Sequence, residues 1–409
     1  MSSNFPPVEE QLEILRRGAV HLVDEPQLRA KLERSRATGK PLTIKAGFDP
    51  SSPDLHLGHT VLLRKMRHFQ DLGHHVVFLV GSFTALIGDP TGKKSTRPQL
   101  TEEQVQENAR TYQEQVWKVL DRERTGVDFN GRWLVPLGSV GIVRLAGRYT
   151  LARMLEREDF KTRFANQQPI HLHELLYPLA QGYDSVVMKP DVELGGQDQI
   201  FNLLVGRDLM KEDGLEPQVV MTTPLLVGLD GLDKMSKSLG NAIAVDDSPR
   251  DMYGRTMSIP DSLMWDWFLL LTDLPQQEIE TRKAAVARGD AHPMEQKHEL
   301  ATAIVRDFHG AEQAVLAAQE FRRVFSAKGV PEEIEHIAIR APLPLAKLLV
   351  EAGLATSNAE GRRLIEQGAV SIDEARAADP FVELPTRSDP YLFKVGKRRF
   401  ARVRVGSSS

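Results

Sequence analysis

Residues 42–81 carry the clearest structural pattern in the chain and read LTIKAGFDPSSPDLHLGHTVLLRKMRHFQDLGHHVVFLVG. Leu42–Phe48 is a short, mostly apolar run that predicts a buried strand, and a helix is expected over Gly58–Leu72, where apolar residues recur at spacings of four and three. Val76–Gly81 is a second apolar strand. Two strands joined by a crossover helix form a βαβ unit, which predicts a parallel sheet.

The same alternation returns later in the chain. Strand-like runs are expected at Ser185–Leu194 and Gln218–Val227, with a helix over Gln199–Met210 between them. The intervening residues, about 101–184, are polar and charge-mixed and predict a helical insertion. Residues 1–245 are therefore expected to form one doubly wound, Rossmann-like α/β domain that a helical insertion interrupts.

Two further domains are expected after the sheet. Strand signals stop near Asp246, and residues 246–330 show helical periodicity, with predicted helices at Leu263–Leu271, Glu295–Phe308 and Ala311–Phe325. A polar linker follows. Residues 342–405 form a small α/β module, which ends in a strand-like tail.

Composition limits the possible functions. The chain has 409 residues, 41% hydrophobic and 26% charged, and a formal net charge of −4, which indicates folded domains and permits only a local basic patch. It has no cysteine, so disulfides, thiolate metal sites and cysteine nucleophiles are excluded. The charged N-terminus and the lack of long apolar runs predict a cytoplasmic protein without membrane contact.

Two histidines flank a glycine where the first predicted helix begins, in His56-Leu57-Gly58-His59. A helix N-terminus offers unpaired N–H groups, so phosphate binds there readily, and imidazoles can donate further hydrogen bonds to phosphate oxygens. Two solvent-facing histidines or a metal-binding pair are the alternatives. No third ligand stands at a recognisable spacing, and we therefore expect no protein-bound metal.

A second candidate segment is Lys234-Met235-Ser236-Lys237-Ser238, which follows an apolar strand in the second half of the predicted sheet. Two lysines and two hydroxyls on a loop flanked by glycines can close over a polyphosphate and neutralise it. An isolated segment of this kind is more often a solvated basic loop. Here it is expected at the same sheet edge as the histidines, where nucleotides bind in such folds.

These two segments resemble the HIGH and KMSKS motifs of class I aminoacyl-tRNA synthetases. Other motifs are similar to those of the bacterial tyrosyl-tRNA synthetase family, namely Gly47–Pro50 (GFDP), Gly88–Lys93 (GDPTGK), Asn130–Trp133 (NGRW), Tyr177–Asp184 (YPLAQGYD) and Gly195–Gln199 (GGQDQ). The resemblance runs from about residue 40 to 405. It implies that ATP activates L-tyrosine to tyrosyl-adenylate with release of pyrophosphate, and that the tyrosyl group then passes to the 3′-terminal adenosine of tRNA-Tyr.

The resemblance also implies roles for individual residues. Those implied in catalysis and phosphate binding are His56, His59, Ser51, Lys93, Arg97, Lys234, Lys237 and Ser238. Those implied in tyrosine binding are Asp184 at the phenol, and Tyr177, Gln181, Asp89, Thr84 and Gln199 towards the amino and carboxylate groups. Those implied in binding ATP and the adenylate are Gly47, Asp49, Gly58, Gly196 and Asp198, together with Lys234 and Lys237. Asn130 and Trp133 match a motif that orders the pocket.

The chain departs from the family pattern at two positions. Many members have a tyrosine that bonds the substrate phenol where this chain has Lys45, and a glutamine is common where it has Glu193. Tyrosine specificity therefore rests on Asp184 and on a feature that the sequence does not reveal. The alternatives are a tryptophanyl-tRNA synthetase, a nucleotidylyltransferase of the same superfamily that acts on a small acid, and a non-catalytic RNA-binding paralogue.

The C-terminal module carries the expected RNA contacts. Lys347–Val370 is similar to the RNA-binding module first seen in ribosomal protein S-four, and the tail Tyr391–Val405 holds six basic residues, two phenylalanines and no acidic residue. Such a composition suits phosphate neutralisation and base stacking. The residues expected to bind tRNA are Arg362, Arg363, Lys397, Arg398 and Arg399. The resemblance further implies an anticodon-arm-binding role for residues 246–330, ATP used with Mg²⁺, no organic cofactor, and a homodimer.

Overall fold

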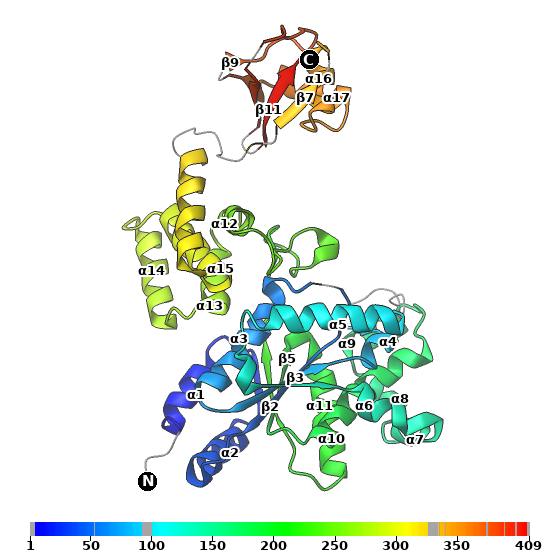
Figure 1. Cartoon of the computed structure of the whole chain (residues 1–409). Coiled ribbons are helices and arrows are strands. Elements are labelled where there is room, and N and C mark those ends of the chain that lie inside the picture. The colour runs from blue at the N-terminus through cyan, green and yellow to red at the C-terminus, as the bar shows by residue number, and fades with distance from the viewer. Residues whose placement is uncertain are drawn as a thin grey trace. The chain divides into compact units, whose positions relative to one another are not determined.

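The computed structural model describes residues 5–52, 54–91, 100–325, 334, 336–339, 341–373, 375–387, 389–396 and 399–406. The chain divides into two compact units, Met1–Ala314 and Val315–Ser409 (Figure 1). In the described residues, no helix is long and apolar enough to cross a membrane.

The described part of the first unit contains a six-stranded sheet in the order β1-β6-β5-β2-β3-β4. Its strands are β1 (His21–Val23), β2 (Thr43–Phe48), β3 (His75–Val80), β4 (Thr125–Phe129), β5 (Val192–Gly196) and β6 (Val219–Thr223). Strands β2 to β6 run parallel, and the edge strand β1 pairs antiparallel with β6. The doubly wound parallel sheet predicted from the sequence is confirmed.

Helices cover the sheet on both sides, and Figure 1 shows β2, β3 and β5 between two groups of them. One group comprises α1 (Val8–Arg16), α2 (Glu25–Thr38), α3 (Leu57–Asp71) and α5 (Glu102–Val116). Their buried apolar side chains, among them Leu12, Leu28, Phe69 and Tyr112, join those of the strands in one core. The other group includes α9 (Glu158–Ala165), α10 (Tyr177–Met188) and α11 (Ile200–Glu212), whose Phe160, Leu179, Val205 and Leu209 share a second core.

The structure corrects the prediction of a strand at Ser185–Leu194. Helix α10 continues to Met188 and ends at Lys189, which has a left-handed backbone with φ 50°, and β5 begins only at Val192. The β-branched pair Val186 and Val187 looks strand-like, but tertiary packing against α11 overrides that local preference.

The region expected to be a helical insertion, residues 101–184, also contains a strand. Its short helices are α6 (Gly131–Leu134), α7 (Gly138–Ala146) and α8 (Leu151–Met154), besides α5 and α9. Strand β4, however, pairs with β3 and completes the sheet edge. Its five residues, TGVDF, are all half-buried and include a glycine and an aspartate, so their sequence lacks the apolar run of an inner strand.

The residues after the sheet are helical. Helices α12 (Pro249–Met257), α13 (Met264–Leu271) and α14 (Gln276–Arg288) precede α15 (Pro293–Phe325). The sequence predicted two helices separated near residue 310, and the backbone of α15 is interrupted at Gly310, where φ is 85°.

The second unit has a five-stranded sheet in the described residues, in the order β7-β11-β10-β8-β9. Its strands are β7 (His336–Ile339), β8 (Val370–Ile372), β9 (Ala375–Arg376), β10 (Tyr391–Val395) and β11 (Arg399–Val405), and its helices are α16 (Leu345–Glu351) and α17 (Asn358–Glu366). Alternate residues of β11 are buried, with Val403 inside and the neighbouring Arg402 and Arg404 outside. This unit therefore has a core of its own.

Candidate active site

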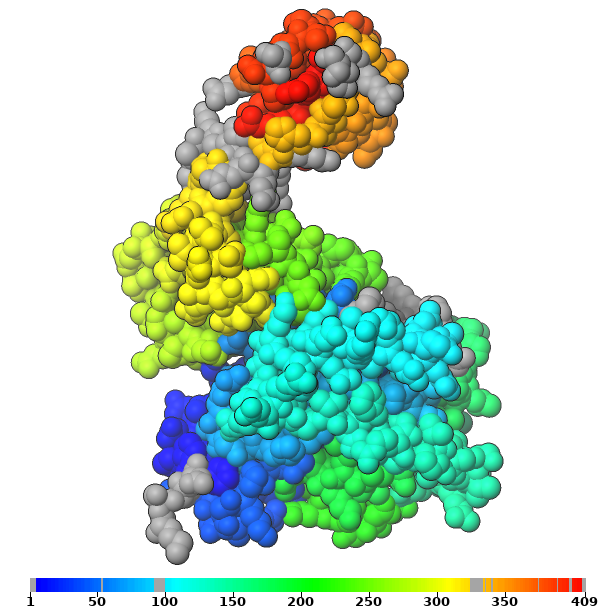
Figure 2. All heavy atoms as spheres, in the orientation of Figure 1, coloured from blue at the N-terminus to red at the C-terminus, as the bar shows by residue number. Residues whose placement is uncertain are grey.

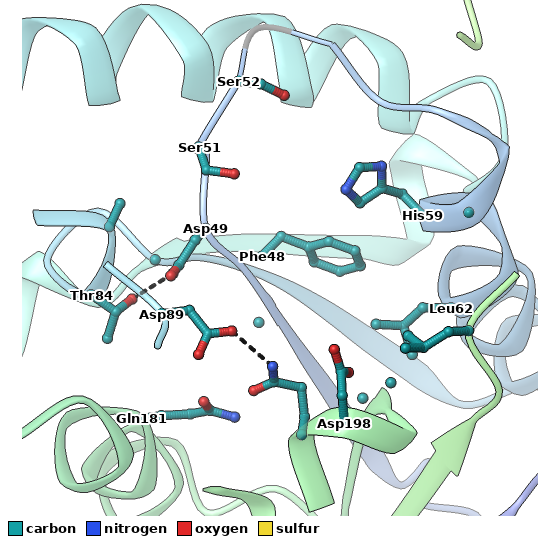
Figure 3. A pocket seen from close by; sticks show the side chains of 18 of the residues that line it. Phe48, Asp49, Ser51, Ser52, His59, Leu62, Thr84, Asp89, Gln181 and Asp198 are labelled. Carbon is teal, nitrogen blue, oxygen red and sulfur yellow. Dashed lines mark hydrogen bonds between the residues drawn. The ribbon is translucent and has the colours of Figure 1, made fainter. Parts of the chain in front are cut away.

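A cavity of about 640 Å³ opens at the carboxyl ends of the parallel strands. Residues at or just after the ends of β2, β3, β5 and β6 line it, among them Gly47, Gly81, Gly196 and Thr223. Figure 3 shows its polar side chains, with Asp49 and Ser51 on the segment after β2 and Asp89, Gln181 and Asp198 opposite. Ligands bind at this edge in open α/β sheets.

The structure brings the predicted ATP- and tyrosine-binding residues together. Every one of them that it describes lines this cavity, namely Gly47, Asp49, Ser51, His56, Gly58, His59, Thr84, Asp89, Tyr177, Gln181, Asp184, Gly196, Asp198, Gln199, Lys234, Lys237 and Ser238. Lys93 and Arg97 lie outside the described residues.

The two histidines cap α3 reciprocally. The Gly58 N–H donates to His56 Nδ1 at 3.1 Å, and the His56 N–H donates to His59 Nδ1 at 3.2 Å. Because each Nδ1 accepts a hydrogen bond, the proton of each neutral ring is on Nε2. A Cβ at position 58 would lie 2.8 Å from the His56 ring, so the cap requires a glycine there.

Burial keeps both histidines neutral. It lowers the pKa of His56 to about 2, helped by the neighbouring His59 and Lys237. It lowers the pKa of His59 to about 4, again with a contribution from Lys237. At neutral pH the turn therefore presents two neutral N–H donors on one wall of the cavity.

The lysine-bearing segment lies against the histidine turn. Residues 56 and 244 form an isolated antiparallel bridge, and the Leu57 N–H donates to the Ile243 carbonyl at 3.0 Å. Lys237 Nζ donates to Asp54 at 2.6 Å, and Lys234 Nζ lies 3.3 Å from Asp198. Both ammonium groups are thus paired with carboxylates, Lys237 with one that precedes the histidines and Lys234 with one that follows β5.

Helix α5 braces the loop that carries the histidines. Asn108 Nδ2 donates to the Pro50 carbonyl at 2.9 Å, and Gln115 Oε1 accepts the Leu55 N–H at 2.5 Å. Gln115 Nε2 also lies 3.3 Å from Asp54. The insertion therefore fixes the phosphate-facing loop from outside the cavity.

Asp184 lies at a deep point of the cavity wall. Its carboxylate accepts the Trp133 indole N–H at 2.8 Å and the Asn130 amide at 3.3 Å, and the residue is only 2% exposed. Burial raises the pKa of Asp184 to about 7, although Lys45 and these two hydrogen bonds pull it down. Tyr177, two turns earlier on the same face of α10, donates its hydroxyl to Asp49 at 2.8 Å.

A second polar group surrounds Asp89. Gln199 Nε2 donates to Asp89 Oδ2 at 2.8 Å, as the dashed line in Figure 3 marks, and Thr91 Oγ1 donates to Oδ1 at 2.5 Å. The guanidinium of Arg157 lies 3.4 Å from the same carboxylate. Asn202 donates to both Gln181 and Gln199, at 3.1 and 2.9 Å. The side-chain oxygens of Asp89, Gln181 and Gln199 thus lie in one wall of the cavity. A substrate ammonium group needs several such acceptors.

Lys45 and Glu193 are partners in the structure. Lys45 Nζ lies 2.8 Å from Glu193 Oε1, and both side chains are buried. Neither residue lines the cavity.

In the C-terminal module, Arg362 and Arg363 are exposed on α17, and the Arg362 guanidinium lies over the ring of Phe381 at 4.9 Å. Arg399 donates to the Leu354 carbonyl at 2.6 Å. Lys397 and Arg398 lie outside the described residues.

Sequence reasoning missed Asp54, Asn108, Gln115, Arg157 and Asn202. Asn202 follows Gln199 by three residues on one helix face, which is a usable signal. The other four belong to polar or charge-mixed segments, where nothing in the sequence separates a residue that faces the site from one that faces solvent.

Comparison with known proteins agrees with this geometry. Residues 37–326 match the family model described as tRNA synthetases class I (W and Y), and residues 343–381 match the S4 domain. The tyrosine–tRNA ligase of Moorella thermoacetica is 52% identical, with 97% of this chain and 96% of the relative covered, and that of Geobacter sulfurreducens is 52% identical, with 97% and 99% covered.

Solved structures show the same fold. A C-terminally truncated mitochondrial tyrosyl-tRNA synthetase from Aspergillus nidulans has a TM-score of 0.63 at 24% identity, covering 80% of this chain and 95% of that one. A tyrosyl-tRNA synthetase from Archaeoglobus fulgidus, complexed with L-tyrosine, has a TM-score of 0.62 at 23% identity, covering 76% and 100%.

The sheet, the histidine turn and the lysine-bearing segment are those of a class I aminoacyl-tRNA synthetase, as the family match over residues 37–326 shows. That model covers tryptophan and tyrosine enzymes alike, whereas the curated relatives named above are tyrosine enzymes. The chain belongs to the tyrosine–tRNA ligase family.

Proposed function

We propose that this chain activates L-tyrosine with ATP and transfers the tyrosyl group to the 3′-terminal adenosine of tRNA-Tyr. The observation that carries the proposal is the single cavity in which the histidine turn, the two motif lysines and Asp184 meet. ATP is the substrate of class I synthetases. The cavity wall offers hydrogen-bond donors and ammonium groups that can bind phosphate, and it also holds the buried carboxylate of Asp184.

The activation step needs no protein nucleophile. The tyrosine carboxylate attacks the α-phosphorus of ATP, a carboxylate–phosphorus bond forms, and the bond to pyrophosphate breaks. Negative charge develops on the phosphate oxygens, and the Nε2–H groups of His56 and His59 and the ammonium groups of Lys234 and Lys237 would stabilise it. Preorganised donors of this kind lower the barrier because they bind the transition state better than ATP.

We assign the phenol end of the substrate to Asp184, which would accept the phenol O–H. Phenylalanine has no hydroxyl and would leave this buried carboxylate without that partner, at a cost in binding energy. Asp89, Gln181, Tyr177, Thr84 and Gln199 would hold the amino and carboxylate groups. Asp49, Asp198, Gly47 and Gly196 would hold the nucleoside part of the adenylate.

Mg²⁺ is expected to arrive with the phosphates of ATP, because this ion keeps most of its water and binds through one or two carboxylates plus phosphate oxygens. In the described residues, no group of three or more His, Asp or Glu side chains could hold a metal ion alone. We also propose a cytoplasmic location, because the curated relatives named above are bacterial tyrosine–tRNA ligases.

We further propose that residues 246–330 bind the anticodon arm, that the S4 domain binds tRNA through Arg362, Arg363, Lys397, Arg398 and Arg399, and that two copies of the chain form a homodimer.

The homodimer proposal is supported by exposed apolar side chains in residues 135–172 of the insertion, namely Val135, Val140, Val143, Leu151, Phe164 and Leu172. Figure 2 shows this segment, in cyan and blue-green, at the surface of the first unit. Apolar side chains exposed in this number are typical of an interface.

The test is amino-acid-dependent ATP–pyrophosphate exchange with each of the twenty amino acids, followed by charging of purified tRNA-Tyr. Exchange should be strong with tyrosine alone, and tRNA-Tyr should become labelled. Exchange with tryptophan in place of tyrosine, or exchange without any tRNA charging, would contradict the proposal.

A further inference from the structure

Two side chains join the ends of the loop that carries the motif lysines. Asp230 precedes the segment Lys234–Ser238, and Asn241 follows it. Asn241 Nδ2 donates to Asp230 Oδ2 at 2.6 Å. Neither side chain lines the cavity, so contact with a substrate in it does not account for this bond.

Asn241 also bonds the backbone of the motif itself. Its Oδ1 accepts the Ser236 N–H at 2.7 Å, and its Nδ2 lies 3.3 Å from the Lys234 carbonyl oxygen. Ser236 directly precedes Lys237. One buried amide, on a residue that is 4% exposed, therefore holds the backbone of Lys234 and of the residue next to Lys237.

Asp230 orders the turn that leads into the motif. Its Oδ1 accepts the N–H groups of Leu232 and Asp233, at 2.9 and 3.0 Å. The two carboxylate oxygens thus have different partners, since Oδ1 bonds the turn and Oδ2 bonds Asn241. An amide at position 230 could not bond both groups in this way, because its nitrogen donates and does not accept.

The two side chains lie beside glycines at which the loop can bend. Asp230 directly precedes Gly231, and Asn241 directly follows Gly240. These glycines have φ values of 72° and 69°. Glycine moves between backbone regions at little steric cost. The Asp230–Asn241 bond joins the chain next to both glycines, and so it limits the shapes that the loop between them can take.

Asn241 has a fixed place against the backbone from which the loop leaves. A Cβ at Gly228 would lie 2.4 Å from Asn241 Cγ, so the side chain packs directly on that glycine. The Leu229 N–H donates to the Asn241 carbonyl oxygen at 2.9 Å, and the Met235 N–H donates to the Leu226 carbonyl oxygen at 2.7 Å. The amide is therefore anchored before it bonds the motif.

We propose that Asp230 and Asn241 form a clamp that holds the loop in the shape in which Lys234 and Lys237 face the triphosphate. The inference rests on the proposed role of these lysines in adenylate formation. The clamp residues act through the loop backbone and are positioning residues. A loop that is ordered in advance loses less conformational entropy as the transition state forms, so the clamp should speed the chemical step.

The test exchanges the two side chains. Asp230→Asn removes the carboxylate that accepts the Asn241 amide, and Asn241→Asp places two carboxylates together. Each should slow adenylate formation about tenfold or more, since a hydrogen bond to a charged group is lost. In Asp230→Asn/Asn241→Asp the bond forms again with donor and acceptor exchanged, and the carboxylate at position 241 still accepts the Ser236 N–H. The exchange variant should recover the rate to within about threefold of the unchanged protein.

Single-turnover rapid-quench kinetics measure this rate at saturating tyrosine and ATP, and equilibrium dialysis measures tyrosine affinity without ATP. Tyrosine affinity should stay within about twofold in all three variants, because Asp184 and the Asp89 group lie at other parts of the cavity wall. A merely structural role would lower both quantities, and the exchange would not restore them. Asp379→Asn is the matched control, since Asp379 accepts the Phe381 N–H at 2.9 Å in a turn of the second unit. It should leave the rate unchanged.

Lys234→Ala separates the clamp from the proposed function. If this variant forms adenylate at the unchanged rate, the proposed role of the lysine is wrong, and the clamp proposal is wrong with it. If Lys234→Ala slows the step but the single clamp variants do not, the role of the lysine stands and the clamp is overturned. An exchange variant no faster than the slower single variant, or a loss of tyrosine affinity equal to the loss of rate, would also overturn the clamp.

Discussion

At the scale of single residues, the site depends on which groups are charged. His56 and His59 are neutral because burial lowers their pKa values to about 2 and 4, and their Nδ1 atoms accept backbone N–H groups. The positive charge opposite the phosphates therefore comes from lysines, and the histidines supply directed hydrogen bonds. Both kinds of group can favour the transition state, because negative charge on the phosphate oxygens grows as the reaction proceeds.

His59→Asn and Lys234→Ala are expected to slow adenylate formation about a hundredfold or more, since each removes a donor from the developing negative charge. Tyrosine binding should change less than about threefold, because Asp184 and the Asp89 group lie at other parts of the cavity wall. Single-turnover kinetics with separate measurement of tyrosine binding would check this. Equal losses in binding with unchanged chemistry would count against it.

The rate of adenylate formation at saturating tyrosine and ATP should be independent of pH from about 5.5 to 8. Both histidine pKa values lie below this window, so neither ring gains a proton within it. Protonation of Asp184, with a pKa of about 7, would affect the KM for tyrosine and leave the maximal rate unchanged. Rapid-quench measurement across the pH range tests this, and a step in the maximal rate near pH 6.5 would indicate a titrating histidine.

At the scale of secondary-structure elements, α3 depends on the reciprocal cap at its N-terminus. A Cβ at Gly58 would lie 2.8 Å from the His56 ring that accepts the Gly58 N–H. The same two hydrogen bonds that cap the helix also hold the rings of His56 and His59, and so they orient the Nε2–H groups of both residues. A change that weakens the cap should therefore affect both stability and catalysis.

Gly58→Ala should lower the free energy of unfolding by about 1–2 kcal/mol, the usual cost of losing an N-cap, and should slow adenylate formation. The matched control is Gly254→Ala within α12, where a Cβ would meet nothing within 4 Å and alanine is the better helix former. That variant should be neutral or stabilised. Denaturant unfolding of both variants makes the comparison, and equal destabilisation would show that the cap at residue 58 is unimportant.

Elements that the sequence predicts well are those in which local pattern and tertiary environment agree. β2, α3 and β3 are buried on the faces that their apolar periodicity indicates, and the motif residues follow from them. β4 is a half-buried edge strand and the end of α10 has β-branched residues, so their states are set by neighbours that the local sequence does not encode. Arg157 and the Lys45–Glu193 contact were out of reach for the same reason, since charge alone does not reveal burial.

At the scale of the whole molecule, the exposed apolar side chains of residues 135–172 bear on assembly. Val143→Asp combined with Phe164→Asp should convert a dimer to a monomer. If the interface includes these residues, each substitution would bury an unpaired carboxylate in it, which is costly. Sedimentation velocity would measure the change. Val315→Asp, at another exposed apolar residue, is the control and should leave the dimer intact. Dimers persisting in the double variant would place the interface elsewhere.

The S4 domain is a separate compact core, so its RNA contacts can be altered without disturbing activation. Arg362 lies over the exposed ring of Phe381, an arrangement that offers a charge to phosphate and a face to a base. Arg362→Glu combined with Phe381→Ala should raise the KM for tRNA at least tenfold and leave tyrosine-dependent pyrophosphate exchange unchanged.

The salt dependence distinguishes a phosphate contact from general loss of folding. If Arg362 neutralises one phosphate, Arg362→Ala should reduce the slope of log affinity for tRNA against log salt concentration by about one. Arg110→Ala is a matched control, since Arg110 is also exposed but pairs with Glu107 on α5 of the first unit. It should leave the slope unchanged. An unchanged slope in Arg362→Ala with weaker binding would mean that this residue stabilises Phe381 and does not contact the backbone of the RNA.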